Sequence, residues 1–223
     1  MDQWNDLEPW WREELVADPA YESVVTPLLL EVLDAPPDAR LLDLGCGDGR
    51  VMRALVADGL KVVGVELVPA LARTALTHGP VVVGRRPEEL PFRSASFDGA
   101  YLVLVLEHVE DHHGVFERVA RVVRPGGSLS LVINHPVWTA PGSTPITDDD
   151  GEVLWRPGGY FDRQGFTEVP AGDDTVVFFH RTTASLLNSA ASAGWALEVM
   201  EERPHHELDD QGGIPRLLAC RWR

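Results

Sequence analysis

Lysine is almost missing from this chain: Lys61 is the only one among 223 residues. Lysine and arginine together number 19 against 35 aspartates and glutamates, so the formal net charge is −16. A surface this acidic repels phosphate backbones, and no run of basic residues offsets the repulsion. We therefore expect no nucleic-acid partner.

Cysteine and long apolar runs are scarce as well. The two cysteines, Cys46 and Cys220, do not suggest a disulfide framework, which favours a reducing cytoplasm. No apolar run approaches the roughly 20 residues of a membrane span, and residues 1–6 are too polar for a signal peptide. We expect a cytoplasmic protein with no membrane partner, either a monomer or a homodimer.

A glycine-rich turn between two apolar runs is the most informative feature that the chain does have. Residues 41–44 are apolar apart from Asp43, which is typical of a buried strand. Residues 62–65 form a second apolar run that ends in Glu66. Between the runs lie three glycines spaced two residues apart: Gly45, Gly47 and Gly49. A strand, a glycine turn, a helix and a second strand with a terminal acid indicate a nucleotide-type binding unit.

The spacing within this turn argues against a dinucleotide. A dinucleotide site favours G-x-G-x-x-G, whereas this chain has G-x-G-x-G followed by Arg50. A carboxylate at Asp43 would lie beside the pyrophosphate, which is electrostatically unfavourable. A ligand that carries an ammonium and a sulfonium would tolerate the same field. Glu66 can accept hydrogen bonds from both hydroxyls of a ribose. A nicotinamide-dependent oxidoreductase remains the first alternative.

The stretch 42–50 resembles motif I of the class I S-adenosylmethionine-dependent methyltransferases, in their small-molecule, ubiquinone-biosynthesis-like branch. Glu66 and the stretches 90–98, 104–109 and 121–127 continue the resemblance in the order of the family. The resemblance implies S-adenosylmethionine as cofactor and methyl transfer to a small-molecule acceptor by in-line displacement. A non-catalytic cofactor-binding protein on the same fold is the second alternative, because a fold does not establish an activity.

Strands and helices are expected to alternate through the middle of the chain. The predicted strands are 40–44, 61–66, 80–83, 98–104 and 127–133, and the predicted helices are 49–58, 69–77, 86–90 and 112–123. Alternation at this spacing predicts an α/β fold with a parallel sheet and helices on both faces. The resemblance implies a Rossmann-like, seven-stranded, mostly parallel sheet, whose antiparallel last strand inserts beside the strand before it.

We expect a single methyltransferase domain, 1–223, made of four parts. These are an N-terminal helical cap or lid (1–38), a cofactor-binding core (39–134), a substrate lid inserted after strand five (135–182), and a C-terminal helix and strand pair (183–223). The insertion has no clear periodicity apart from a strand at 175–180, and a long irregular segment is typically a functional lid. A helix is predicted at 24–33 and another at 183–193.

The resemblance also implies which residues bind the cofactor. The methionine part falls to the glycine turn, the ribose to Glu66 and Leu67, and the adenine to Pro87 and Glu88. A backbone carbonyl at Leu104 and the side chain of Tyr21 would reach the methionine end. The complete set of cofactor residues is Tyr21, Asp43, Gly45, Cys46, Gly47, Glu66, Leu67, Pro87, Glu88 and Leu104. Cys46 is expected to be a small filler, not a reactive thiol.

His108 and His135 each follow a predicted strand, and histidine can accept a proton near neutral pH. They are the candidate catalytic bases, although His108 could instead order the cofactor loop. The aromatic insertion predicts an apolar or aromatic acceptor. Its candidate substrate-binding residues are Trp138, Trp155, Tyr160 and His180, and His180 could instead bond to the backbone of the lid.

Two further points concern the termini and metals. Trp4, Trp10 and Trp11 would either cover the cofactor or fasten the N-terminal segment to the core. The chain has no compact set of metal ligands at a recognisable spacing, so we expect no metal.

Overall fold

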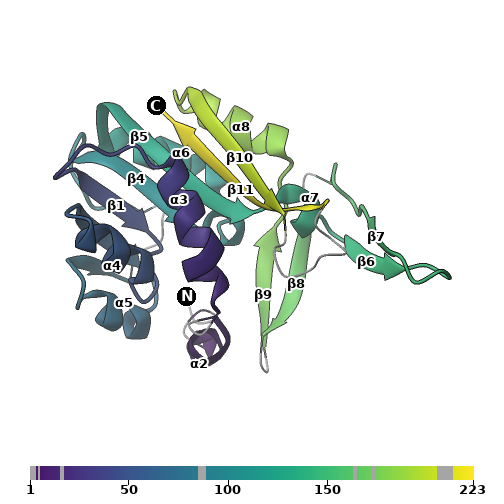
Figure 1. The fold of residues 1–223 in the computed structure, drawn as a ribbon. Helices are drawn as coiled ribbons and strands as arrows, with labels where there is room; N and C mark the ends of the chain where they lie inside the picture. Colours follow the sequence, from purple (N-terminus) through teal and green to yellow (C-terminus); the bar gives the residue numbers. More distant parts are fainter. Residues whose placement is uncertain are drawn as a thin grey trace.

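A seven-stranded sheet forms the centre of the molecule, in the order β10-β11-β5-β4-β1-β2-β3 (Figure 1). The computed structural model describes residues 4, 6–15, 18–84, 89–162, 165–171, 174–204 and 213–223. The strands of the sheet are β1 (Arg40–Leu44), β2 (Lys61–Glu66), β3 (Val81–Val83), β4 (Phe97–Val103), β5 (Val123–Asn134), β10 (Leu197–Pro204) and β11 (Pro215–Trp222).

Strands β1 to β5 pair in parallel, and β11 lies antiparallel between β5 and β10, so that six of the seven strands run in the same direction. The predicted seven-stranded, mostly parallel sheet with an inserted antiparallel last strand is therefore confirmed. The inner strands are buried on both faces, as expected of strands that are apolar along almost their whole length. Asp43 on β1 lies in register with Tyr101 on β4, so an acid and a phenol face each other inside the sheet.

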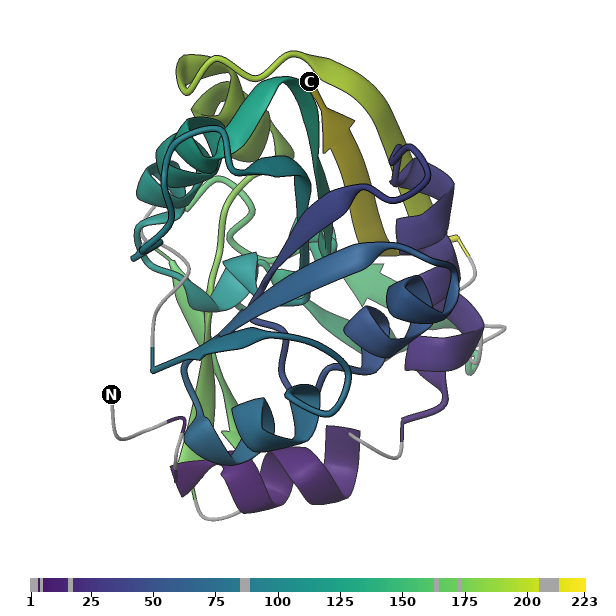
Figure 2. The same cartoon turned by 90° about the vertical axis from the view of Figure 1, so that its left-hand side faces the viewer.

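Helices cover both faces of the sheet, as predicted (Figures 1 and 2). Leu28 and Leu29 of α3 (Thr26–Val32) and Met52 of α4 (Arg50–Ala57) are buried in one apolar cluster. Phe116 of α6 (His112–Val122) and Leu186 of α8 (Thr183–Ser192) are buried in another. A fifth helix, α5 (Pro69–Ala75), packs against β2 and β3. None of the described helices is long and apolar enough to cross a bilayer.

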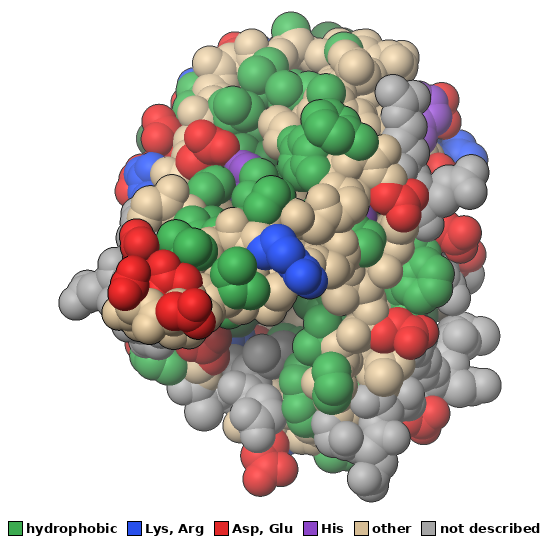
Figure 3. Space-filling model, turned by 90° about the vertical axis from the view of Figure 1, so that its right-hand side faces the viewer, with side chains coloured by type: hydrophobic (Ala, Val, Ile, Leu, Met, Phe, Trp, Pro, Cys, Tyr) green, Lys and Arg blue, Asp and Glu red, His purple; other side chains and the backbone are tan. Residues whose placement is uncertain are grey.

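The segment between β5 and α8 has more regular structure than its sequence indicates. It contains the short helix α7 (Pro136–Thr139) and two antiparallel hairpins. The hairpins pair β6 (Thr144–Thr147) with β7 (Val153–Arg156), and β8 (Phe166–Ala171) with β9 (Asp174–Phe179). Only β9 was predicted. The β6–β7 hairpin projects away from the sheet (Figure 1). On the face seen in Figure 3, the described residues show scattered acidic side chains and no broad basic surface.

The N-terminal segment folds as short helical pieces: α2 (Glu8–Trp10), η1 (Trp11–Leu15) and η2 (Tyr21–Val25), the last two with π-helical bonding. The helix predicted at 24–33 is thus split, because its first two residues belong to η2. Strand β5 begins at Val123, four residues before its predicted start. Most of the helix predicted at 86–90 lies outside the described residues, and its last two residues are not helical.

Candidate active site

A cavity of about 490 Å³ opens at the carboxyl ends of β1, β2, β4 and β5. Ligands of open α/β sheets bind at this edge, and the volume is within the usual range for small-molecule sites. The sheet contributes Asp43, Gly45, Gly47, Glu66, Leu67, Leu104 and Asn134 to its lining. The N-terminal segment and the β8–β9 hairpin cover the opposite side with Trp4, Trp10, Trp11, Val176, Val177 and Phe178.

The glycine turn is shaped by two close contacts. Gly45 has a φ of +74°, and a Cβ added there would lie 2.6 Å from Cγ2 of Val105. Gly47 has a φ of +55°, and its added Cβ would lie 3.3 Å from the Trp11 indole. Residues other than glycine avoid this backbone region, so both positions need glycine for the turn to keep its conformation and its close contacts with Val105 and Trp11.

Two buried carboxylates stand beside the turn. Asp43 is 3% exposed and accepts a 2.9 Å hydrogen bond from the Tyr101 hydroxyl. Burial raises the pKa of Asp43 to about 8; the Tyr101 hydrogen bond opposes the rise, and the nearby charges of Glu66 and Asp48 add to it. This end of the cavity is therefore acidic, and a cationic ligand bound there would favour the charged forms of these acids.

Glu66 ends β2 and is hydrogen bonded to the glycine turn that follows β1. Its Oε2 accepts a hydrogen bond from the Gly47 N–H, and its Oε1 accepts one from the Val68 N–H, both at 2.8 Å. Burial raises its pKa, and the backbone bonds oppose that rise. A carboxylate has about four lone-pair sites, so each oxygen can still accept from a ribose hydroxyl.

Cys46 is a packing residue. Its thiol is buried, and burial together with the neighbouring acids raises its pKa. A Cβ added to Gly64 on β2 would lie 2.5 Å from Sγ of Cys46, so the sulfur fills the space that Gly64 leaves. A thiol kept protonated in this way is a poor nucleophile, in line with the filler interpretation.

The N-terminal segment is fixed to the glycine turn through Arg50. The guanidinium forms an ion pair with Asp48 at 3.2 Å and lies over the rings of Tyr21, 4.2 Å from its centroid, and Trp11, at 5.1 Å. Burial raises the pKa of Tyr21, so its hydroxyl remains a donor at the cavity wall. Trp4 and Trp10 pack with Leu7 against the β8–β9 hairpin and also line the cavity. These tryptophans therefore line the cavity and also pack against the rest of the fold, while a role in covering the cofactor stays a prediction.

His108 lies in the cavity wall. Its Nδ1 is 2.9 Å from the backbone oxygen of Val177, and Trp4 and Phe178 pack edge-on against its ring. A carbonyl oxygen only accepts, so Nδ1 must carry the proton. The neutral ring then keeps its lone pair on Nε2.

His135 is placed differently from the prediction. It is 3% exposed and is not part of the cavity lining. Its Nε2 lies 2.8 Å from Oε1 of Glu202, and its Nδ1 accepts from the Val137 N–H at the start of α7. Because both ring nitrogens are used within the fold, we assign no catalytic role to His135.

The aromatic residues chosen for substrate binding contact one another outside the cavity lining. The rings of Trp138 and Trp155 are stacked, with their centroids 4.4 Å apart. Tyr160 bonds to Thr183 through its hydroxyl, and His180 donates from Nε2 to the backbone oxygen of Tyr160. These contacts hold the inserted segment together, and for His180 they match the alternative of a bond to the lid backbone. The insertion instead reaches the cavity with Val169, Val176, Val177, Phe178 and Phe179.

The remaining predicted positions divide into two groups. Leu67 and Leu104 line the cavity. Leu104 has a φ of +54°, which is unfavourable for leucine, and such strained residues cluster at functional sites. Pro87 and Glu88 lie outside the described residues. Among the residues that the structure covers, no group of three or more ligand-type side chains could hold a metal.

Sequence reasoning missed the polar residues at the far end of the cavity. Asn134 ends β5 and Arg216 is the second residue of β11, and the two side chains are hydrogen bonded to each other. Neither belongs to a recognisable motif. Arg216 becomes a cavity residue only because β11 inserts beside β5.

A glycine turn and two acids at the carboxyl edge of an open α/β sheet define a Rossmann-like protein that binds a nucleotide-type cofactor. Residues 42–131 match the family described as "Methyltransferase domain". The ubiquinone biosynthesis O-methyltransferase of Hahella chejuensis is 37% identical over 130 residues, which is 54% of this chain and 54% of the relative. The one from Xanthomonas oryzae pv. oryzae is 32% identical over 132 residues. The chain spans about half the length of these curated relatives.

Solved structures agree over a larger part of the chain. An S-adenosylmethionine-dependent methyltransferase from Mesorhizobium loti is similar with a TM-score of 0.78 and 27% identity, over 94% of this chain and 99% of the other. The fold is shared with 1,6-didemethyltoxoflavin-N1-methyltransferase from Burkholderia thailandensis, solved with S-adenosylhomocysteine, at a TM-score of 0.63 and 18% identity, over 95% of this chain and 81% of the other. The family model covers less than half of the chain, and the solved structures extend the similarity over most of it, so the chain is similar to S-adenosylmethionine-dependent methyltransferases in its core and in its fold. These similarities do not favour the nicotinamide or non-catalytic alternatives.

Proposed function

We propose that this protein transfers a methyl group from S-adenosylmethionine to a small-molecule acceptor by in-line displacement. The single observation that carries the proposal is that one cavity joins an acidic, glycine-lined end to an apolar end covered by β8–β9, with His108 in its wall. The acidic end suits a cofactor that carries a sulfonium and an ammonium.

The proposed cofactor contacts follow from the residues at the acidic end. Glu66 would accept from the ribose hydroxyls, and Asp43 would provide negative charge near the methionine ammonium. Gly45, Cys46 and Gly47 provide the backbone of the turn, while Tyr21, Leu67 and Leu104 complete the wall. The adenine contacts proposed for Pro87 and Glu88 remain predictions.

S-adenosylmethionine supplies a methyl group attached to a positively charged sulfur. The protein would hold the acceptor in line with that bond, and positioning alone can contribute a large part of the acceleration. The N-terminal segment and the β8–β9 hairpin would exclude water. His108 would take the proton of an acceptor hydroxyl at Nε2, and the relatives named for O-methylation support an oxygen nucleophile.

Several broader features belong to the same proposal. We propose a single domain with a cap at 1–38, a core at 39–134, an insertion at 135–182 and a C-terminal part at 183–223. Buried free thiols at Cys46 and Cys220 support a reducing, cytoplasmic location. The acidic composition supports an acceptor other than nucleic acid, and the protein would act as a monomer or a homodimer.

Calorimetry with S-adenosylhomocysteine, combined with transfer of a tritiated methyl group to a panel of phenols, tests the proposal. Glu66→Gln should weaken binding about 10-fold to 100-fold, because a charged acceptor of ribose hydroxyls becomes neutral. The matched control Glu117→Gln changes an exposed carboxylate on α6 and should leave affinity unchanged. Two results would contradict the proposal. The first is that the protein binds NADH tightly and does not bind S-adenosylmethionine or S-adenosylhomocysteine. The second is that it binds the cofactor but transfers no methyl group to any acceptor.

A further inference from the structure

Arg216 gives the far end of the cavity a positive charge. It lies at the start of β11, lines the cavity and is part-buried. One of its nitrogens, Nη1, donates to Oδ1 of Asn134, and its guanidinium lies 4.6 Å from the centroid of the Trp138 ring. A guanidinium has five N–H donors in a planar fork, so these contacts leave donors available for a ligand.

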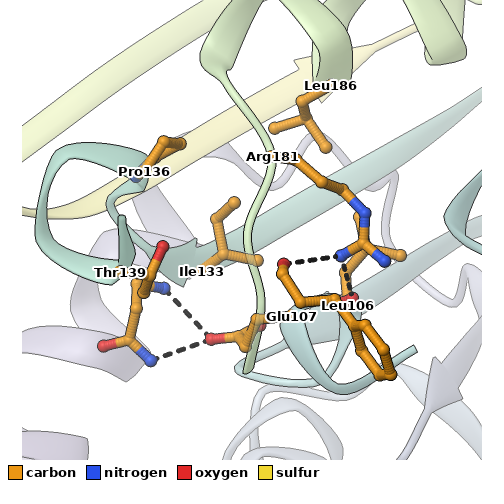
Figure 4. A pocket seen from close by; sticks show the side chains of 9 residues that line it. Leu106, Glu107, Ile133, Pro136, Thr139, Arg181 and Leu186 are labelled. Atoms are coloured by element: carbon orange, nitrogen blue, oxygen red, sulfur yellow. Dashed lines mark hydrogen bonds between the residues drawn. The ribbon is translucent and has the colours of Figure 1, made fainter. Parts of the chain in front are cut away.

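Asn134 fixes the direction of that fork. Its Nδ2 donates to Oε1 of Glu107 at 2.8 Å, and its backbone N–H donates to the same oxygen at 3.1 Å. Glu107 is 5% exposed and lines a second, small pocket of about 20 Å³ (Figure 4). Arg181 lines the same pocket and donates to the backbone oxygens of Leu106 and Phe179. The amide of Asn134 therefore has a defined orientation, with its oxygen toward Arg216.

Among the residues that the structure describes, no carboxylate forms a direct ion pair with Arg216. Glu107 and Asp18 act on it electrostatically, but within the described part of the chain neither carboxylate is ion-paired with it. Burial lowers the pKa of Arg216 to about 10, which leaves it charged at neutral pH. A part-buried guanidinium that has one nitrogen bonded and one face against an aromatic ring is well suited to a planar carboxylate.

The sheet sets the distance between the two charged ends. Asp43 is on β1 and Arg216 is on β11, with β4 and β5 between them. Three strand spacings amount to about 14 Å at roughly 4.8 Å each. His108 follows β4, between the two ends. An acceptor placed against His108 would thus have its remote end near Arg216, while the cofactor methionine lies near the β1 turn.

We infer that the methyl acceptor carries a carboxylate, which Arg216 binds at the β5–β11 end of the cavity with Asn134 as its positioning partner. The inference rests on the proposed function and names the class of acceptor for it. The acceptor would have an apolar body against Val176, Phe178 and Phe179, a nucleophile near His108 and an acid group at the opposite end. The cofactor also has a carboxylate, and the experiment must separate the two sources.

Binding of matched probe pairs tests this inference. Each pair has one carboxylate and its neutral amide: 4-hydroxybenzoate and 4-hydroxybenzamide, indole-3-acetate and indole-3-acetamide, hexanoate and hexanamide. Affinities are measured in the presence of saturating S-adenosylhomocysteine, by the change in tryptophan fluorescence. This signal is suitable because Trp4, Trp10 and Trp11 line the cavity. The wild-type protein should bind the acid of at least one pair about 10-fold to 100-fold more tightly than its amide.

Arg216→Met keeps much of the stem and removes the charge, so the preference for the acid should disappear while the affinity for the amide stays. Arg216→Lys keeps the charge without the fork and should retain part of the preference, which also covers the case in which the methionine variant fails to fold. Arg221→Met is the matched control, since Arg221 lies on the same strand and pairs with Glu198 away from the cavity. It should keep the full preference.

Two results would overturn the inference. The first is an absence of acid preference in all three pairs with wild-type protein. The second is a loss of S-adenosylhomocysteine affinity in Arg216→Met as large as the loss for the acid probe, because Arg216 would then hold the cofactor carboxylate. Neither result affects the proposed methyl transfer, which fails only if the wild-type protein does not bind the cofactor or does not transfer its methyl group.

Discussion

The Tyr101 hydroxyl on β4 donates a 2.9 Å hydrogen bond to the Asp43 carboxyl group on β1, and the two residues are register partners inside the sheet. The pair is buried, so the charged form of Asp43 loses its hydration and its pKa rises to about 8. In the free protein at neutral pH this group is mostly protonated. A cationic cofactor would reverse that balance, because it stabilises the charged form.

The first prediction concerns stability and pH. The pKa of Asp43 is about 8 in the folded protein and close to 4 in the unfolded chain, so the folded protein binds more protons between these values. Its contribution to the free energy of unfolding should therefore fall as pH rises from about 4 to 8. Between pH 5 and 9 the wild type should lose on the order of 4 kcal/mol relative to Asp43→Asn, measured by urea unfolding. Parallel pH curves for the two proteins would contradict this.

The second prediction concerns the cofactor. Binding of S-adenosylmethionine at pH 7 should release up to about one proton, because the ammonium and sulfonium favour the charged form of Asp43. Calorimetry in buffers of different ionisation enthalpy measures this number. The Asp43→Asn variant lacks this carboxyl group, so the protons released when it binds the cofactor come from other sources, such as the ligand itself. It should release fewer protons than the wild-type protein. Equal release by both proteins would show that Asp43 does not titrate on binding.

The third prediction concerns packing between the glycine turn and β2. Gly64→Ala should lower the free energy of unfolding by about 1–3 kcal/mol, because its Cβ would overlap Sγ of Cys46. Adding Cys46→Ala removes the sulfur and should restore most of the loss. A double-mutant cycle from urea unfolding measures the coupling. Strictly additive losses would mean that Cys46 is not the residue that requires glycine at position 64.

The fourth prediction concerns the proposed base. His108→Gln should reduce methyl transfer to a hydroxyl acceptor about 100-fold, since the side chain can no longer take a proton. The affinity for S-adenosylhomocysteine should stay within about twofold if His108 acts on the acceptor and not on the cofactor loop. His113→Gln, at an exposed position on α6, is the control. A matching loss of cofactor affinity in His108→Gln would favour the loop-ordering role.

The cofactor end of the cavity could be predicted because its determinants are local. Gly45 and Gly47 follow β1 directly, and Glu66 ends the next strand along the chain. Adjacent parallel strands bring their carboxyl ends together, so these positions meet in any fold of this class. The same logic located Leu104 and His108 after β4.

The acceptor end could not be predicted in this way. Trp138 of α7 and Trp155 of β7 were chosen by residue type, but residue type does not say which way a side chain faces, and here the two rings stack on each other. Phe178 faces the cavity instead, beside a pair of valines. Arg216 and Asn134 are 82 residues apart in the sequence and are joined only by the pairing of β11 with β5.

The sequence by itself determined the order of strands and helices, the glycine turn and the acids beside it, because backbone sterics and apolar periodicity act over a few residues. The tertiary structure decided which histidine lines the cavity, which hairpin covers it and where its positive charge stands. Those outcomes depend on contacts between strands far apart in the chain: His108 against Val177, and Arg216 against Asn134.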